Sequence, residues 1–310
     1  MHIDPYIVLG AAIIGLLVGM TGAGGGALMT PMLILLFGVT PSSAISSDLV
    51  AAVVMRPFGA AVHLRARTVN LRLVMWMVIG SVPAAFAGSY LLHLVGHTSA
   101  AQHNVQRALG AALLIGAAAM AFRYVLDRRS GQARTAAVGE VQVRPARTVA
   151  IGVVGGLIVG MTSVGSGSLM IVLLLFLYPN LAAGRLVGTD LTQAVPLTLA
   201  AAAGALIFGH VVFSVTASLI IGSVPAVIVG SLVSSTVPDR YVRPVIALVI
   251  FASGLKYVGI PNAALGWVLC GLLLVAGALW LAAVQPWRSA PPAPPEPVPE
   301  PESALVSDEV

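Results

Sequence analysis

Apolar segments, separated by short polar loops, run along almost the whole chain. A helix needs about 20 apolar residues to cross a bilayer, and most of the segments approach that length. The segments lack the alternation of a membrane β-barrel, so they predict an all-α integral membrane protein. They are, in order, Tyr6–Met20, Ala27–Phe37, Ala44–Leu64, Leu71–Leu94, Val105–Phe122, Val149–Met161, Leu169–Tyr178, Leu186–Phe208, Val215–Ser234, Val242–Val258 and Ala263–Ala283.

Two pairs of segments are too short to span a bilayer. Tyr6–Met20 with Ala27–Phe37, and Val149–Met161 with Leu169–Tyr178, each flank a glycine-rich break. We interpret each pair as a broken or re-entrant helical hairpin. Non-helical backbone at membrane depth is tolerated only where protein buries it or a cavity lies beside it. The two breaks are therefore the predicted working part of the molecule.

The chain contains the same pattern twice. The first break, Gly19–Met29, is matched by Gly160–Met170. Further matches join Ser47-Asp48-Leu49 to Thr189-Asp190-Leu191, Gly80-Ser81-Val82-Pro83 to Gly222-Ser223-Val224-Pro225, and Gly88-Ser89 to Gly230-Ser231. The pattern predicts two repeats, each a hairpin plus three spanning helices. The predicted parts are a first repeat at 1–126, a cytoplasmic linker at 127–147, a second repeat at 148–260, an extra helix at 261–285 and a disordered Pro/Glu-rich cytoplasmic tail at 286–310.

Composition supports a membrane protein and excludes other classes. Hydrophobic residues make up 58% of the chain and charged residues 9%, against about 25% charged in soluble domains. The net charge of +5 is no nucleic-acid signal, because the arginines lie in short loops between spans. The single cysteine, Cys270, lies in an apolar run and suggests neither an intrachain disulfide nor a metal site. The first span begins near Asp4 without the basic start of a signal peptide, so we expect it to be retained.

The positions of the arginines predict the orientation. The loops at 39–43, 96–103, 209–214 and 259–262 contain no Lys or Arg. If each short pair makes zero or two net crossings, all the basic loops fall on the cytoplasmic face. The N-terminus then lies outside and the C-terminus inside. The first half starts outside and the second inside, which predicts inverted repeats with a site at their interface, as in many secondary transporters. The arginines that mark this face are Arg65, Arg67, Arg72, Arg123, Arg128, Arg129, Arg134, Arg144, Arg147, Arg185, Arg240, Arg243 and Arg288.

The breaks are the candidate substrate site. Each precedes a short helix, and a helix N-terminus carries free N–H donors and partial positive charge, so two of them predict an anion cradle. Two alternatives stay open: glycines that only let helices pack closely, and a cation site formed by the carbonyl ends of the preceding helices. The candidate residues are Thr21, Gly22, Ala23, Gly24, Gly25 and Gly26 in the first break and Thr162, Ser163, Gly165, Ser166 and Gly167 in the second.

Charged and amide side chains inside the apolar segments are further candidates. Asp48 and Asp190 occupy matched positions and either couple protons or cap helices and breaks. Arg56 lies well inside its span, and its matched position is Thr198; it either contacts substrate or pairs with a carboxylate. Gln193 is a candidate donor to substrate.

No metal, cofactor or catalytic site is predicted. His93, His97 and His103 cluster near a predicted outer loop that lacks carboxylates. Gly165-Ser166-Gly167, with His210 elsewhere, could suggest a serine protease, but a nucleophilic serine needs a positioned base. The matched first-half residue is Gly25, which carries no nucleophile, so the repeat explains the motif.

The motifs resemble those of the sulfite exporter TauE/SafE family. The resemblance rests on Gly15–Gly26, the Ser-Asp-Leu run and Gly-Ser-Val-Pro with Gly88-Ser89, together with Gly209-His210-Val211 and Gly222–Gly230, and it covers roughly residues 10–260. It implies a permease of bacterial-type plasma membranes that moves sulfite, sulfonates and similar anions, often outward. It also implies that the two glycine-rich loops form the site. Ser163 and Ser166 replace Gly22 and Gly25 in the second copy, and Arg56 is not part of the family motif.

The sequence therefore predicts a secondary transporter of a small sulfur-containing anion that works by alternating access. The expected partners are this solute and the lipid bilayer, with no nucleic acid, and homo-oligomerisation is left open. The expected location is the cell (inner or plasma) membrane. Two alternatives are a cation or metal permease built on the same broken helices, and a non-transporting membrane scaffold that acts through the tail.

Overall fold

Ten α-helices make up the described part of the chain. The computed structural model describes residues 3–21, 25–65, 67, 69–95, 99–129, 142–167, 169–178, 181, 183–233 and 239–261. The helices are α1 (Pro5–Thr21), α2 (Gly26–Phe37), α3 (Pro41–Arg65), α4 (Leu71–Val95), α5 (Ser99–Arg129), α6 (Pro145–Thr162), α7 (Leu169–Leu177), α8 (Ala183–Phe208), α9 (Phe213–Val233) and α10 (Asp239–Val258). The all-helical prediction is confirmed, and each of the first ten predicted segments corresponds to one helix.

The sixth predicted segment was too short. Instead of Val149–Met161, α6 runs from Pro145 to Thr162 and has 18 residues, enough to be a candidate membrane span. Pro145 starts the helix because a proline at the first position loses no hydrogen bond. The ends of the predicted linker, 127–147, are therefore helical, and residues 130–141 lie outside the described residues. The partner of α6, α7, is short as predicted, with nine residues.

Length and polarity of the helices fit a bilayer. Six of them, α3, α4, α5, α6, α8 and α9, are long and apolar enough to cross a membrane, and shorter apolar helices lie at 5–20, 26–37 and 246–258. Large apolar side chains face outward: Tyr6 is 74% exposed, Leu36 76% and Leu232 74%. Most of the serines and threonines that the structure describes are buried. Apolar side chains thus occupy both the interior and the outer surface, as contact with lipid requires.

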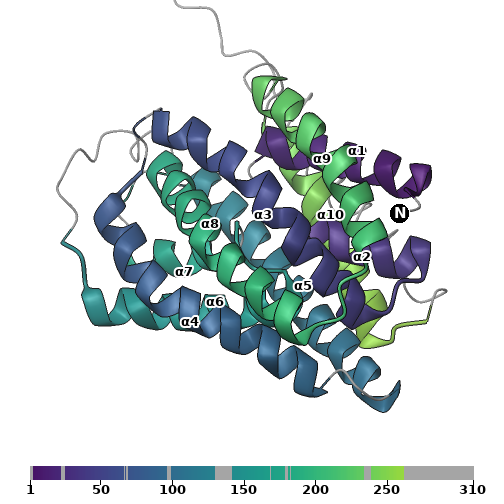
Figure 1. Ribbon diagram of the computed structural model, residues 1–310. Helices are drawn as coiled ribbons and strands as arrows, with labels where there is room; N and C mark the ends of the chain where they lie inside the picture. The colour runs from purple at the N-terminus through teal and green to yellow at the C-terminus, as the bar shows by residue number, and fades with distance from the viewer. Residues whose placement is uncertain are drawn as a thin grey trace, which may run out of the picture. The chain divides into compact units, whose positions relative to one another are not determined.

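The helices pack in matched pairs drawn from the two halves (Figure 1). Helix α1 lies along α9, and α4 lies along α6. The helices that carry the aspartates, α3 and α8, lie against each other, and so do α5 and α10. Every one of these contacts joins a first-half helix to a second-half helix. The inverted orientation of the repeats and their boundaries stay predictions.

Two of these pairs approach so closely that only glycine fits. A Cβ built at Gly160 would lie closer than 3.0 Å to the carbonyl of Ala85 in α4, and one at Gly19 closer than 3.0 Å to the carbonyl of Val227 in α9. The obstructing atoms are backbone, so no side chain can rotate away. Small residues at matched positions thus set the α1–α9 and α4–α6 spacing.

Gly160→Ala is expected to lower the melting temperature of the detergent-solubilised protein. Overpacking against backbone costs about 1–3 kcal/mol, whereas Gly→Ala in a helix is otherwise favourable. Gly59→Ala in α3 is the matched control, because a Cβ there meets nothing within 4 Å. An equal melting temperature for the two variants would contradict the close packing of α4 against α6.

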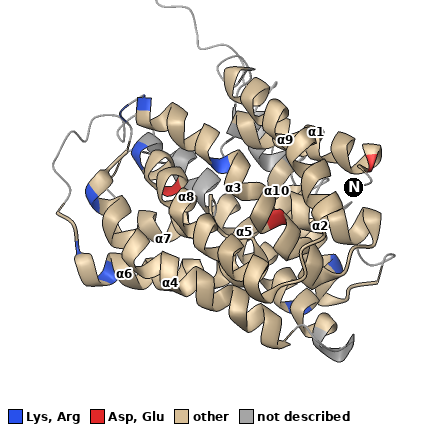
Figure 2. Cartoon of the chain, in the orientation of Figure 1, with Lys and Arg blue, Asp and Glu red and all other residues tan. Residues whose placement is uncertain are grey.

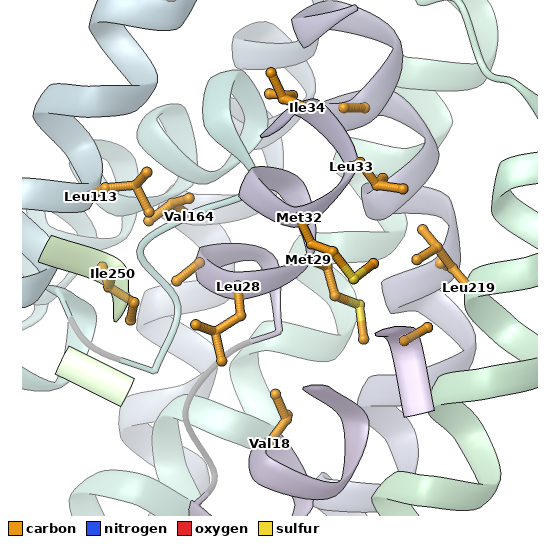
Figure 3. Packing of buried hydrophobic residues seen from close by; sticks show 14 of the residues in the cluster. Val18, Leu28, Met29, Met32, Leu33, Ile34, Leu113, Val164, Leu219 and Ile250 are labelled. Carbon is orange, nitrogen blue, oxygen red and sulfur yellow. The ribbon is translucent and has the colours of Figure 1, made fainter. Parts of the chain in front are cut away.

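The short helices are the centres of two apolar clusters. Around α2, buried side chains of α1, α5, α9 and α10 gather with Val164 of the second break (Figure 3). Around α7, a second cluster includes Ile171 and Leu174 of α7 with Met77 of α4 and Leu197 of α8. Most residues of each short helix are thus buried by protein, as a broken helix at membrane depth requires.

Charged residues lie mainly toward the ends of helices, with long uncharged stretches between them (Figure 2). Arg65 ends α3, and Arg72, Arg147 and Arg185 lie near the starts of α4, α6 and α8. The chain divides into a unit of Met1–Leu265 and a unit of Gly266–Val310. The predicted helix at 261–285, apart from Pro261, and the tail at 286–310 lie outside the described residues.

Candidate functional site

The second break is a buried, left-handed stretch of backbone. Helix α6 ends at Thr162 and is capped by Ser163, whose φ is 58° and whose N–H donates to the carbonyl of Val159 at 2.7 Å. Gly165 and Gly167 have φ of 122° and 90°, conformations that favour glycine, and they form an isolated bridge. The Thr162 hydroxyl donates to the carbonyl of Ile158 at 2.6 Å and accepts the N–H of Val164 at 3.2 Å. These bonds stabilise the break without a regular helix.

The first break touches the second. Gly22, Ala23, Gly24 and the side chain of Thr21 lie outside the described residues, so the site is described from Gly25 onward. The carbonyl of Gly25 accepts the N–H groups of Leu28 and Met29 and so starts α2. A Cβ at Gly26 would overlap the carbonyl oxygen of Ser163. The two breaks therefore lie in backbone contact where Gly26 meets Ser163.

Asp48 connects the two breaks. Its carboxylate is fully buried, and Oδ2 accepts the hydroxyls of Thr30 in α2 and of Ser163 in the second break, each at 2.8 Å. Its other oxygen, Oδ1, is buried and has no hydrogen-bond partner among the described residues. One first-half carboxylate thus holds both breaks by one oxygen and leaves the other available.

Asp190 is bound by both oxygens. Oδ2 accepts the backbone N–H of Gly167 at 2.6 Å, and Oδ1 accepts the Gln193 amide at 3.2 Å. The Gln193 carbonyl oxygen in turn accepts the hydroxyl of Ser81 in α4 at 3.2 Å. All three side chains are fully buried. Asp190 therefore stabilises the backbone of the second break.

Arg56 interacts electrostatically with both carboxylates but has no hydrogen bond among the described residues. Its side chain is 7% exposed, and Nε, Nη1 and Nη2 are all buried without a partner among the described residues. Asp190 and Asp48 both act on it electrostatically. A buried guanidinium with unused donors is costly unless an anion completes it. Of the polar groups that the structure describes, it is the one best suited to accept an anionic solute.

Comparison with known proteins identifies the family. A family model described as "Sulfite exporter TauE/SafE" matches residues 7–257. The chain belongs to the sulfite exporter TauE/SafE family. A relative from Bacillus subtilis (strain 168), named "Probable membrane transporter protein YjnA", is 39% identical over 253 residues, which is 81% of this chain and 98% of the relative. No solved structure matches the chain significantly. The protein is thus a multi-pass membrane transporter of the TauE/SafE family.

This TauE/SafE chain brings together most of its predicted site residues that the structure describes. Gly26 and Asp48 each contact Ser163, and Gly167, Asp190 and Gln193 form a second group. One part of the anion cradle differs from the prediction, because the Gly167 N–H donates to Asp190 and is not free for substrate. Ser166 is buried, and the amide N–H of Gln193 donates a hydrogen bond to Asp190.

Sequence reasoning missed Thr30 and Ser81 of this family member. Thr30 is a polar residue inside the apolar segment Ala27–Phe37, and that interruption was a usable signal. Ser81 belongs to the repeated Gly-Ser-Val-Pro motif, but nothing in the sequence indicated that it bonds Gln193 across the two halves. The described residues contain no cluster of three or more His, Cys, Asp or Glu that could hold a metal, and His97 lies outside the described residues.

Ser81→Ala is expected to destabilise the TauE/SafE protein more than the matched Ser223→Ala. Ser81 donates to Gln193, whereas the Ser223 hydroxyl is buried without a partner in the described chain. The residue matched to Gln193 is Ala51, which explains the difference. Losing the Ser81 bond costs about 0.5–1.5 kcal/mol, and removing an unsatisfied hydroxyl costs little or stabilises. Thermal unfolding in detergent measures both; a larger loss for Ser223→Ala would contradict the assignment.

Proposed function

We propose that this transporter moves a small sulfur-containing anion, such as sulfite or an organosulfonate, by alternating access around the two breaks. The observation that carries the proposal is the buried Arg56 guanidinium with no hydrogen-bond partner among the described residues. Sulfite and sulfonates present several oxygens to the forked donors of an arginine, which bind oxyanions in a bidentate manner. The printed name of the family, a sulfite exporter, supports the same class of solute.

The proposed path runs along the contact between the halves. Asp48 and Ser163 join the two breaks, and α3 and α8 carry Asp48, Arg56 and Asp190 against each other. Movement of one half against the other would alter this contact and open the site to each side in turn. We place the protein in the cell membrane as an exporter or permease, with the N-terminus outside and the C-terminus cytoplasmic, on the basis of the arginine positions.

A cation permease is the second candidate, because one observation favours it. Two buried carboxylates stand near one guanidinium, and Asp48 Oδ1 has no hydrogen-bond partner in the described chain. A small cation could occupy that oxygen. A permease of this kind would lose transport when Asp48 is neutralised and would be indifferent to sulfur anions.

Counterflow in proteoliposomes tests the proposal. The purified protein is reconstituted with unlabelled sulfite inside, and uptake of radiolabelled sulfite is followed with methanesulfonate, sulfoacetate, phosphate or chloride as competitors. We expect saturable uptake that sulfonates inhibit and chloride does not. Vesicles without protein supply the background. Counterflow of a metal cation, together with none of sulfite or any sulfonate, would overturn the anion proposal in favour of the cation permease.

A further inference from the structure

Three charged side chains are buried in the described part of the chain, and they do not balance. Asp48 and Asp190 supply two carboxylates and Arg56 one guanidinium, so the buried group has one negative charge in excess when all three are ionised. An anion that binds Arg56 adds another negative charge to the same region. Buried charges without compensation are strongly disfavoured inside a membrane protein. Anion binding therefore calls for a positive charge that arrives with the anion.

The two carboxylates differ in their capacity to accept that charge. Both oxygens of Asp190 already accept hydrogen bonds, from the Gly167 N–H and the Gln193 amide. Asp48 uses only Oδ2, while Oδ1 is buried without a partner among the described residues. The difference follows from the sequence, because Ala51 stands where the second half has Gln193.

We propose that Asp48 takes up one proton on Oδ1 with each anion that binds, and that Asp190 is a positioning residue that keeps its charge and holds the second break. This inference rests on the proposed function, since it assumes an anionic solute. The proton comes from the aqueous side that the site faces and converts the Asp48 carboxylate to a neutral acid. Arg56 then balances Asp190, and the bound anion restores the original excess of one negative charge. Release of anion and proton on the other side returns Asp48 to its ionised form.

Few other ionisable groups are placed to compete for this proton. Helices α2 and α9, which both contact α3, contain none. Helix α8 contributes Asp190, and α3 itself contributes Arg56. The other ionisable residues of α3, α4, α5, α6 and α8 lie toward helix ends: His63, Arg65, Arg72, Tyr90, His93, His103, Arg107, Arg123, Tyr124, Asp127, Arg128, Arg129, Arg147 and Arg185. The loop between α8 and α9, which packs against Ser46 and Ser47, adds His210.

Calorimetric titration with methanesulfonate measures the coupled proton. Methanesulfonate stays ionised throughout the working pH range, so any proton taken up belongs to the protein. Titrations of the purified full-length protein in buffers of different ionisation enthalpy give the number of protons bound with each anion. We expect about one proton per anion for the wild type and none for Asp48→Asn, which resembles the protonated acid and still binds. Gln193→Ala, which removes a donor to Asp190 and the acceptor of Ser81 but none of the hydrogen-bond partners described for Asp48, should keep the proton.

Infrared difference spectra supply a second measurement. They are recorded on the wild type and so do not depend on the Asp48→Asn variant, which lacks the charge. Binding of methanesulfonate should produce a new protonated-carboxyl band, and Ser163→Ala should shift that band because it removes a donor from the other oxygen of Asp48. Methanesulfonate binding without proton uptake and without the new band would overturn the inference and leave the proposed function intact. Proton uptake that persists in Asp48→Asn would assign the proton elsewhere and would also overturn it. Failure of the wild type to bind either sulfite or methanesulfonate would instead overturn the proposed function, and the inference with it.

Discussion

Arg56→Gln is expected to weaken sulfite and sulfonate binding roughly 10- to 100-fold for each charge-assisted hydrogen bond lost, at about 1.5–3 kcal/mol per bond. The glutamine cannot supply the positive charge, and its amide replaces the forked donors with a single group. Arg56→Lys keeps the charge but not the fork, so its affinity should fall between those of Arg56→Gln and the wild type. Counterflow of labelled sulfite and calorimetry with methanesulfonate both measure the loss.

The controls for this variant separate binding from folding. Arg72→Gln removes an exposed arginine at the start of α4 and should leave affinity unchanged. Because Arg56→Gln leaves Asp48 and Asp190 without their neighbouring positive charge, its thermal unfolding must be recorded alongside. Wild-type affinity in a folded Arg56→Gln protein would show that Arg56 pairs with the carboxylates only and does not contact the anion.

Gly26→Ala is expected to abolish transport and to lower the melting temperature. The added Cβ would overlap the backbone and the hydroxyl of Ser163, and neither can withdraw without moving the second break. Ser163 also donates to Asp48, so its displacement would break the bond that joins the two breaks. Overpacking of this kind costs about 1–3 kcal/mol, and a larger cost follows where backbone must shift.

Gly25→Ala is the matched neighbour for this test. Its Cβ would meet the end of the Met55 side chain at 2.6 Å, and that side chain is flexible enough to move. We therefore expect Gly25→Ala to keep much of the sulfite counterflow that Gly26→Ala loses. Equal flux for the two variants would contradict the backbone contact between Gly26 and Ser163.

The sequence predicted the helices and the breaks because both depend on local patterns. Ten apolar segments were recognisable from length and polarity, and the breaks from glycines at matched positions. The start of α6 was missed because its first turn, Pro145 to Thr148, is polar enough to resemble a loop. Family membership was also accessible, since the repeated motifs carry it.

The hydrogen-bond partners of the site residues could not be predicted from the sequence. The two aspartates occupy matched positions, yet Asp48 accepts two hydroxyls and Asp190 accepts a backbone N–H and an amide. These partners come from helices distant in the chain, and their choice depends on tertiary packing. A repeat predicts equal roles for the aspartates, whereas differences at matched positions make their surroundings unequal: Ala51 against Gln193, Thr30 against Ile171 and Gly22 against Ser163.

Each half of the molecule supplies the anchor for the start of a helix in the other half. The N–H of Asn70, just before α4, donates to the hydroxyl of Thr189 in α8, and the N–H of Val212, just before α9, donates to the hydroxyl of Ser47 in α3. We therefore expect the two halves to depend on each other as the subunits of an obligate dimer do. Either half produced alone would lack both its anchor and the partner of its glycine face, so we expect stable folding only when both halves are present.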